Sequence, residues 1–236
     1  MKGMILAGGT GSRMAPLTTA VNKHLLPIGD RPMLQHGVEK LRDAGITEIL
    51  ITTGPDAIGD LARLLGGGSD LGVEITWRVQ DRPGGISQAI ALAEGFTGDD
   101  ALCVLLGDNI FEDALDGHVA AYPGRGARVL LRAVPDPERF GVADVDGDRI
   151  VRIVEKPANP TSNLAVTGLY IYDGTVFDRI RTLKPSARGE LEVSDLNQTY
   201  VDDGTLTFGV VEGWWTDAGT HASYARANAL VRGDAD

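Results

Sequence analysis

The chain has 236 residues, 43% of them apolar, and its 22 basic residues against 33 acidic ones give a formal charge of −11. This length can bury the core of one α/β domain, whereas the acidic balance disfavours nucleic acid and anionic membranes as partners, because both need basic surface. No apolar run approaches the ~20 residues that span a bilayer, and a single cysteine, Cys103, excludes disulfide and multi-cysteine metal frameworks.

The chain begins with MKGMILAGG, a short apolar stretch that runs directly into glycines. This pattern predicts a strand and a turn rather than a signal peptide, so we expect a cytoplasmic protein. Beyond it, β-rich runs alternate with amphipathic stretches, as is typical of a mostly parallel sheet covered by helices. We predict strands over 3–7, 48–52, 74–79 and 101–106, and helices over 32–44, 57–65 and 86–95.

Polar segments follow several of these predicted strands. Ligands of open parallel sheets bind at the carboxyl ends of the strands, so residues 8–13, 80–85 and 107–109 are expected to converge on one crevice. After Gly124 the predicted strands are shorter and separated by turns, with a tight turn at 146–148. These later elements are strands over 128–134, 141–145, 150–155, 165–172 and 206–211, and helices over 192–203 and 221–231.

The glycine-rich segment 8–13, GGTGSR, follows the first predicted strand. Its glycines allow backbone N–H groups to approach a polyphosphate, and Arg13 adds a positive charge. The alternative is a structural strand-to-helix turn. A P-loop is disfavoured because the segment lacks the Gly-Lys-Ser/Thr ending, and a dinucleotide site because Met14 stands where the third glycine is needed.

Three charged residues elsewhere could act with this loop. Pro27 limits helix continuation, so Lys23 can turn back toward the loop, although it could also be a surface lysine. Asp108 ends the most apolar predicted strand, and Asp217 lies between a strand and the last helix. Two carboxylates facing a triphosphate are ligands that Mg²⁺ accepts. The alternative for each aspartate is a helix cap or a turn.

Taken together, the ordered motifs closely resemble the sugar-1-phosphate nucleotidyltransferases, and the glucose-1-phosphate thymidylyltransferases in particular. The motifs are GGTGSR, KHLLP, GDN, ERFGV, EKP, AVTGLY, RGELE and WxDAGTH, in the order and approximate spacing of that family. The resemblance runs from Lys2 to about Asn228. The chain looks like the short form, without the extra helical tail of longer members.

The resemblance implies an α/β, Rossmann-like nucleotidyltransferase fold, with a mostly parallel central sheet and helices on both faces. It implies a single domain over 1–236, with a nucleotide-binding half at 1–124 and a sugar-phosphate-binding half at 125–236. The implied reaction is Mg²⁺-dependent transfer of a nucleotidyl group from dTTP or UTP to glucose 1-phosphate, with release of pyrophosphate. Homo-oligomer formation is left open.

The resemblance also implies roles for individual residues. Charge neutralisation and catalysis are expected of Arg13, Lys23 and Lys156. Nucleotide contacts are expected of Leu6, Ala7, Gly8, Gly9, Thr10, Gly11, Gln80, Gly85 and Asp108. Sugar-phosphate contacts are expected of Asn109, Gly141, Glu155, Lys156, Val166, Arg188 and Glu190. Asp108 and Asp217 are the expected metal ligands.

Several alternatives stay open on the sequence. The acceptor could be another sugar 1-phosphate or a sugar-like phosphate, and the chain could be a non-catalytic sugar-nucleotide-binding module. A nicotinamide-dependent oxidoreductase would leave the lysines and the Glu155-Lys156-Pro157 segment unexplained. His24 stands where many thymidylyltransferases carry glutamine, so it could read the base and relax its choice, or it could only pack beside Pro27.

Overall fold

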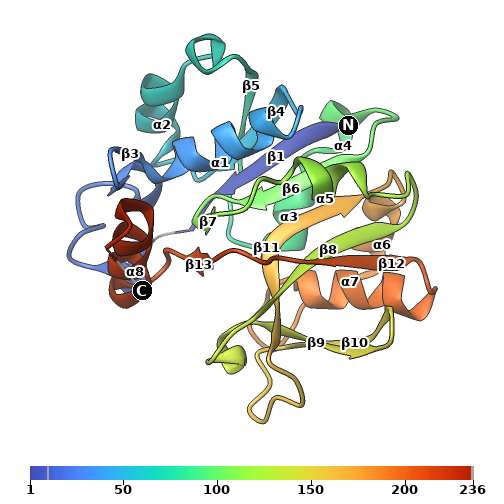
Figure 1. Ribbon diagram of the computed structural model, residues 1–236. Helices are drawn as coiled ribbons and strands as arrows, with labels where there is room; N and C mark the ends of the chain where they lie inside the picture. The colour runs from blue at the N-terminus through green and yellow to red at the C-terminus, as the bar shows by residue number, and fades with distance from the viewer. Residues whose placement is uncertain (10, 235–236) are drawn as a thin grey trace. The chain divides into compact units, whose positions relative to one another are not determined.

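A computed structural model describes residues 1–9 and 11–234 of the chain (Figure 1). Backbone contacts divide the chain into two compact units, each assembled from segments that are distant in the sequence. Unit 1 comprises Met1, Gly84–Val104 and Gly117–Glu212, whereas unit 2 comprises Lys2–Pro83, Leu105–Asp116 and Gly213–Asp236. Within the described residues, no helix combines the length and the apolar character needed to cross a bilayer.

Parallel strands form the sheet of unit 2. Strand β1 (Lys2–Ala7) pairs with β4 (Glu48–Thr53), and β4 pairs with β5 (Glu74–Val79). The side chains of β1 and β4 are almost all buried, as expected for parallel strands that are covered on both faces. These three strands confirm the predictions from the sequence to within one residue. Strand β6 (Leu102–Leu106) has residues in both units.

Three helices of unit 2 support this sheet and the loops at its edge. They are α1 (Met33–Asp43), α2 (Ile58–Leu65) and α8 (His221–Arg232). Helix α1 buries one apolar face and is followed by Gly45, whose φ of 82° is the left-handed conformation that commonly ends a helix. A capping box of Thr220 and Ser223 begins α8.

Unit 1 contains a mixed sheet. Its strands are β8 (Ala127–Ala133), β9 (Gly141–Asp146), β10 (Arg149–Glu155), β11 (Leu164–Tyr172) and β12 (Leu206–Val210). Strands β9 and β10 form a hairpin, and β11 is antiparallel to both β8 and β9. The hairpin turns at Gly147, where φ is 59°, which confirms the predicted tight turn. Strand β12 is parallel to β8.

Helices of unit 1 differ from the prediction at three places. They are α3 (Ile86–Ala91), α4 (Glu94–Thr97), α5 (Asp116–Ala120), α6 (Val176–Thr182) and α7 (Val193–Asp202), with Asp116 itself in unit 2. The single helix predicted over 86–95 is wrong, because the Leu92 amide bonds to the Ala89 carbonyl in a tighter turn that separates α3 from α4. Helices α5 and α6 were not predicted.

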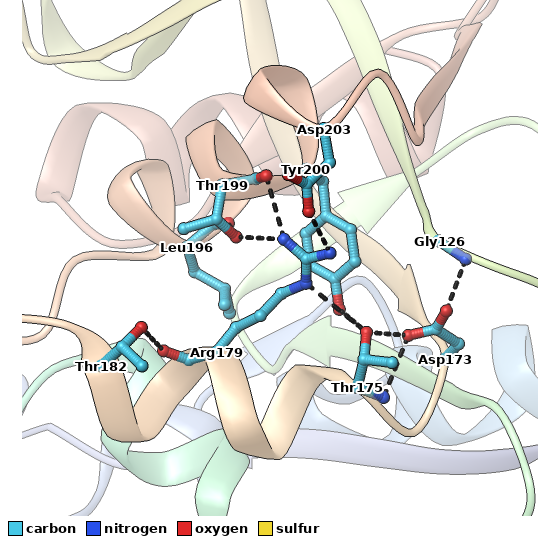
Figure 2. Close-up of polar contacts among 9 residues, drawn as sticks. All are labelled: Gly126, Asp173, Thr175, Arg179, Thr182, Leu196, Thr199, Tyr200 and Asp203. Carbon is cyan, nitrogen blue, oxygen red and sulfur yellow. Dashed lines mark hydrogen bonds and ion pairs between the residues drawn. The ribbon is translucent and has the colours of Figure 1, made fainter.

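Arg179 of α6 joins that helix to α7 (Figure 2). Its guanidinium donates to the Thr199 carbonyl at 2.9 Å and to Asp203 Oδ2 at 2.6 Å. The same group lies 3.9 Å above the centre of the Tyr200 ring, within the range of a cation–π contact. These contacts fix α6 against α7 within unit 1.

Candidate functional site

Asp108 lies in unit 2, directly after β6, and contacts one of the predicted lysines. Lys23 Nζ lies 2.5 Å from Asp108 Oδ2, and the two side chains are 12% and 15% exposed. Burial favours the protonated carboxyl, but the charge and hydrogen bond of Lys23 outweigh it and hold the pKa of Asp108 well below its usual range. Asp108 is therefore an ionised carboxylate at neutral pH.

Asp217 lies beside Asp108 because two short strands pair. Strands β7 (Asn109–Phe111) and β13 (Trp215–Asp217) are antiparallel, with Asp217 opposite Asn109. The Ala218 amide donates to the Asp108 carbonyl at 2.7 Å and extends this pairing. The sequence placed Asp217 only between a strand and the last helix, so this pairing is new.

Three of the predicted residues approach one point at Gly219. A Cβ atom on Gly219 would lie 3.3 Å from Asp108 Oδ2 and 3.4 Å from both Arg13 Nη2 and Asp217 Oδ2. Glycine therefore keeps the space between these charged groups free of a side chain. Since Lys23 contacts Asp108, the structure brings all four predicted charged residues of unit 2 together.

Asp108 and Asp217 are suited to hold a divalent cation. Mg²⁺ keeps several waters and takes phosphate oxygens, so one or two protein carboxylates are sufficient ligands. Over residues 1–9 and 11–234, no cluster of three or more histidine, cysteine, aspartate or glutamate side chains forms a metal site. The two carboxylates therefore fit a metal that binds together with a phosphate-bearing substrate, rather than one enclosed by protein ligands.

Two glycines of the loop have positive φ angles. Gly9 and Gly11 have φ angles of 90° and 64°, which glycine adopts readily. The next three residues form the short 3-10 helix η1 (Ser12–Met14), in which the Arg13 side chain is exposed. Thr10 lies outside the described residues. Leu6 and Ala7 end β1 with buried side chains.

Gln80 lies against the start of the same loop. A Cβ atom on Gly8 would lie 3.2 Å from the Gln80 side-chain oxygen. Within unit 2, the structure thus brings together the loop and one of the two residues predicted to contact the base. The second, Gly85, lies in unit 1.

His24 is buried, with 1% of its surface exposed. Its Nδ1 lies 2.8 Å from Asn22 Oδ1, and a Cβ atom on Gly107 would lie 2.9 Å from its Nε2. Burial, followed by the charge of Lys23, lowers the pKa of His24 to about 3, although Asp108 opposes this effect. These contacts favour the structural alternative for His24 over base reading.

Asn109 was expected to hold a sugar hydroxyl, and the structure places it in unit 2 beside the predicted metal ligands. It is 5% exposed. Its Nδ2 donates to Asp108 Oδ1 at 2.9 Å, and its Oδ1 accepts from Trp215 Nε1 at 2.8 Å. Contact with the sugar stays a prediction, while the link to Asp108 is a property of the fold.

Glu155 is the centre of the predicted sugar-binding residues of unit 1. Its Oε1 accepts from Lys156 Nζ at 2.7 Å, and its Oε2 accepts from Ser194 Oγ at 2.6 Å. Burial opposes ionisation, but these bonds and the charges of Lys156 and Arg188 lower the pKa of Glu155. A Cβ atom on Gly141 would lie 2.8 Å from Ser194 Oγ, so glycine is needed there.

Lys156 has a left-handed backbone, with φ of 43°, which is uncommon for a residue with a side chain. Its amide donates to the Phe140 carbonyl at 2.9 Å, which holds the residue in place. Such conformations cost of order 1 kcal/mol and cluster at functional sites. The conformation therefore supports a functional role for Lys156.

Arg188 is oriented by a residue that the sequence analysis did not single out. Its Nη2 and Nε contact the two carboxylate oxygens of Glu192 at 2.8 and 3.2 Å. The same Nη2 lies 3.6 Å from Glu155 and 3.9 Å from Glu190. Arg188, Glu155 and Glu190 are therefore neighbours, as predicted.

Two further predicted residues lie in unit 1. Gly85 has φ of 94°, and a Cβ atom on it would lie 2.6 Å from the Leu191 carbonyl oxygen, so only glycine fits without a backbone shift. Val166 of β11 pairs with Leu131 and is 8% exposed. Its side chain belongs mainly to the core.

Five residues to which the sequence assigned no role orient the predicted ones or leave space between them. They are Asn22, Glu192, Ser194, Trp215 and Gly219. Glu192 is the last residue of the RGELE motif and is 8% exposed. Its place in a motif that also contains Arg188 was the one sign in the sequence that the two residues could pair. Ser194 carried no signal, because nothing in the sequence links it to Glu155.

The chain matches the family described as nucleotidyl transferase over residues 2–233. It belongs to the nucleotidyl transferase family. A glucose-1-phosphate thymidylyltransferase of Neisseria meningitidis is 46% identical over 238 residues, which cover 98% of this chain and 83% of that protein. A low-salt glycan biosynthesis nucleotidyltransferase of Haloferax volcanii is 43% identical over 238 residues, which cover 99% and 67%.

A solved structure supports the same family. A Bacillus anthracis protein, described as a candidate glucose-1-phosphate thymidylyltransferase in complex with a sucrose, is 54% identical and has a TM-score of 0.95. The match covers 100% of this chain and 96% of that chain. The predicted fold class, a mixed α/β fold with a mostly parallel central sheet, is thus confirmed.

Proposed function

We propose that this chain transfers the nucleotidyl group of dTTP, or of UTP, to glucose 1-phosphate and releases pyrophosphate. The observation that carries the proposal is the approach of Arg13, Asp108 and Asp217 to one point at Gly219. The identity of 46% to a relative that is named for this activity supports it. Mg²⁺ is the proposed cofactor, held by Asp108 and Asp217.

The reaction needs no general base from the protein. The second ionisation of a phosphate monoester has a pKa of about 6, so the acceptor is largely a dianion at neutral pH. One of its oxygens forms a bond to the α-phosphorus of the triphosphate, and the bond from that phosphorus to the pyrophosphate oxygen breaks. The protein therefore contributes mainly positioning and charge.

Charge neutralisation on the nucleotide falls to unit 2. Two like unit charges 4 Å apart repel by about 4 kcal/mol at an effective dielectric of 20, so a dianion meeting a triphosphate needs several cations. Arg13 is exposed in its loop and can reach a phosphate, and Lys23 is held by Asp108. When bound, Mg²⁺ stabilises charge on the triphosphate and on the pyrophosphate.

The sugar phosphate is the proposed ligand of unit 1. Lys156 and Arg188 both contact Glu155 and are about half exposed, so their remaining donors can bind a phosphate. Glu155 and Glu190 are the proposed acceptors for sugar hydroxyls. Glu192 holds Arg188 and Ser194 holds Glu155, which supports a site whose groups are oriented before the ligand binds.

The first experiment tests the metal ligands. Pyrophosphate release from dTTP and glucose 1-phosphate should fall at least ~100-fold in Asp108→Asn and in Asp217→Asn, because each loses a metal ligand. Asp60→Asn is the matched control, since that aspartate forms a surface ion pair with Arg63. Thermal melts should show that each variant is folded, and near-normal rates in both site variants would exclude this assignment.

A second experiment separates the alternative substrates and functions. Each nucleoside triphosphate is assayed against several sugar 1-phosphates, and the highest kcat/KM identifies the natural pair. A non-catalytic binding module would bind a sugar nucleotide in calorimetry without releasing pyrophosphate from any pair. Turnover that requires a nicotinamide cofactor would instead favour an oxidoreductase.

A further inference from the structure

Trp215 is linked to the Asp108 carboxylate through Asn109. The indole Nε1 donates to Asn109 Oδ1 at 2.8 Å, and Asn109 Nδ2 donates to Asp108 Oδ1 at 2.9 Å. Trp215 and Asn109 are 6% and 5% exposed, so water has little access to this chain of bonds. Buried hydrogen bonds of this kind hold their groups in one geometry.

The direction of the two bonds follows from the chemistry of the groups. An indole N–H can only donate, so the atom of Asn109 that faces Trp215 must be the carbonyl oxygen. The amide nitrogen then faces Asp108, whose ionised carboxylate can only accept. A rotated amide would place its oxygen against the carboxylate and its N–H₂ against the indole N–H, which is unfavourable at both ends.

The same tryptophan also belongs to the strand that carries the second carboxylate. In the β7–β13 ladder, Trp215 lies opposite Phe111, and Asp217 lies opposite Asn109. The Trp215 and Phe111 rings have centroids 6.4 Å apart, so the pair packs across the two strands. The position of Trp215 therefore bears on both carboxylates.

Donors from two directions orient Asp108. Asn109 binds Oδ1, and Lys23 binds Oδ2. Lys23 has a charged ammonium group with three donors, and it can transfer its contact to a phosphate when the nucleotide binds. Asn109 is then the donor that continues to hold the carboxylate, provided that Trp215 holds Asn109.

We propose that Trp215 is a positioning residue that orients Asp108, through Asn109, for a divalent cation. The inference rests on the proposed function, because it assumes that Asp108 and Asp217 bind the cation. Groups that bond to metal ligands in this way commonly change metal affinity or activity by about 10- to 100-fold when they are removed.

The test removes the indole N–H and measures cation binding directly. Trp215→Phe deletes the donor, and site-specific replacement of Trp215 by 3-benzothienylalanine deletes it while keeping the shape of the ring. Trp77→Phe is the matched control, because its indole N–H donates to the Gly66 carbonyl on another part of unit 2. Mn²⁺ binding to each full chain is titrated by calorimetry with dTTP bound and no sugar phosphate present, well below the melting temperature, because the site fits a cation that binds together with phosphate oxygens.

We expect both Trp215 variants to bind Mn²⁺ about 10-fold more weakly than the natural chain. The Mg²⁺ concentration for half-maximal rate should rise by a similar factor, and kcat at fixed Mg²⁺ should fall. The KM for sugar phosphate does not decide the test, because Asn109 is itself predicted to contact the sugar. The Trp77 control should match the natural chain in all of these measurements.

A purely structural tryptophan would give a different result. Both variants would then melt at a lower temperature and bind Mn²⁺ as tightly as the natural chain, which would overturn the inference. If the natural chain itself neither binds Mn²⁺ nor releases pyrophosphate, the proposed function fails instead. The benzothienyl variant keeps the test decisive if Trp215→Phe does not fold.

Discussion

His24→Gln should reduce the loss of folding stability between pH 6 and pH 4.5. In the folded chain, burial lowers the pKa of His24 to about 3, whereas a histidine in the unfolded chain titrates near ~6.5. Below that pH the unfolded chain binds a proton that the folded chain does not. The neutral imidazole therefore makes its full contribution to folding stability above about pH 6.5, and this contribution is lost as the pH falls toward 3.

The size of the effect follows from the same pKa values. At a pH where the unfolded chain holds one full proton more than the folded chain, the free energy of unfolding changes by about 1.4 kcal/mol per pH unit. Because the unfolded histidine is already partly protonated at pH 6, the loss between pH 6 and pH 4.5 is about 2 kcal/mol. The pKa of Asp108 is also lowered, but stability from an aspartate is lost only below about pH 4.

Urea unfolding at pH 6.0, 5.2 and 4.5 measures the effect. The free energy of unfolding should fall by about 2 kcal/mol less in His24→Gln than in the natural chain, since glutamine does not titrate. Other titrating groups are common to both proteins and cancel in this difference. Equal pH dependence in His24→Gln and the natural chain would refute the reasoning.

Three further substitutions test packing in unit 1 by thermal or urea unfolding. Gly85→Ala should destabilise the chain by at least ~2 kcal/mol, because Gly85 has a positive φ and the new Cβ would meet the Leu191 carbonyl oxygen. Wild-type stability of this variant would contradict that geometry. Tyr172→Phe should cost about 1–3 kcal/mol, since it removes the 2.6 Å bond to buried Asn197 Oδ1; a neutral result would indicate that water replaces the hydroxyl. Arg179→Ala should lower the free energy of unfolding by about 1–2 kcal/mol, because it loses the ion pair with Asp203 and the contact with the Tyr200 ring (Figure 2). An unchanged unfolding midpoint would show that neither contact contributes.

The long buried strands could be predicted because their own sequences specify them. Strands β1 and β4 each contain a short continuous apolar run, which is the pattern of a parallel strand covered on both faces. Helix α1 could be predicted from its buried face and from Gly45 at its end. In each case, residues close in the sequence contain the whole signal.

The short strands that carry the proposed metal site could not be predicted in this way. Strands β7 and β13 have three residues each, too few for an alternating pattern to be recognised. Their pairing joins Asn109 to Asp217, which lie far apart in the sequence. It depends on tertiary contacts, such as the bond from the Ala218 amide to the Asp108 carbonyl.

The same limit explains why site residues were easier to find than the residues that orient them. Asp108 stands in a motif whose carboxylate suggests its chemistry, whereas Trp215, although it begins the WxDAGTH motif, has no charge that would suggest a role at a metal site. Its contribution depends on which atom its indole N–H meets, and only the fold determines that this atom is Asn109 Oδ1. A carboxylate can be recognised as a candidate ligand from its residue type, but its orientation is a property of neighbours brought together by the fold.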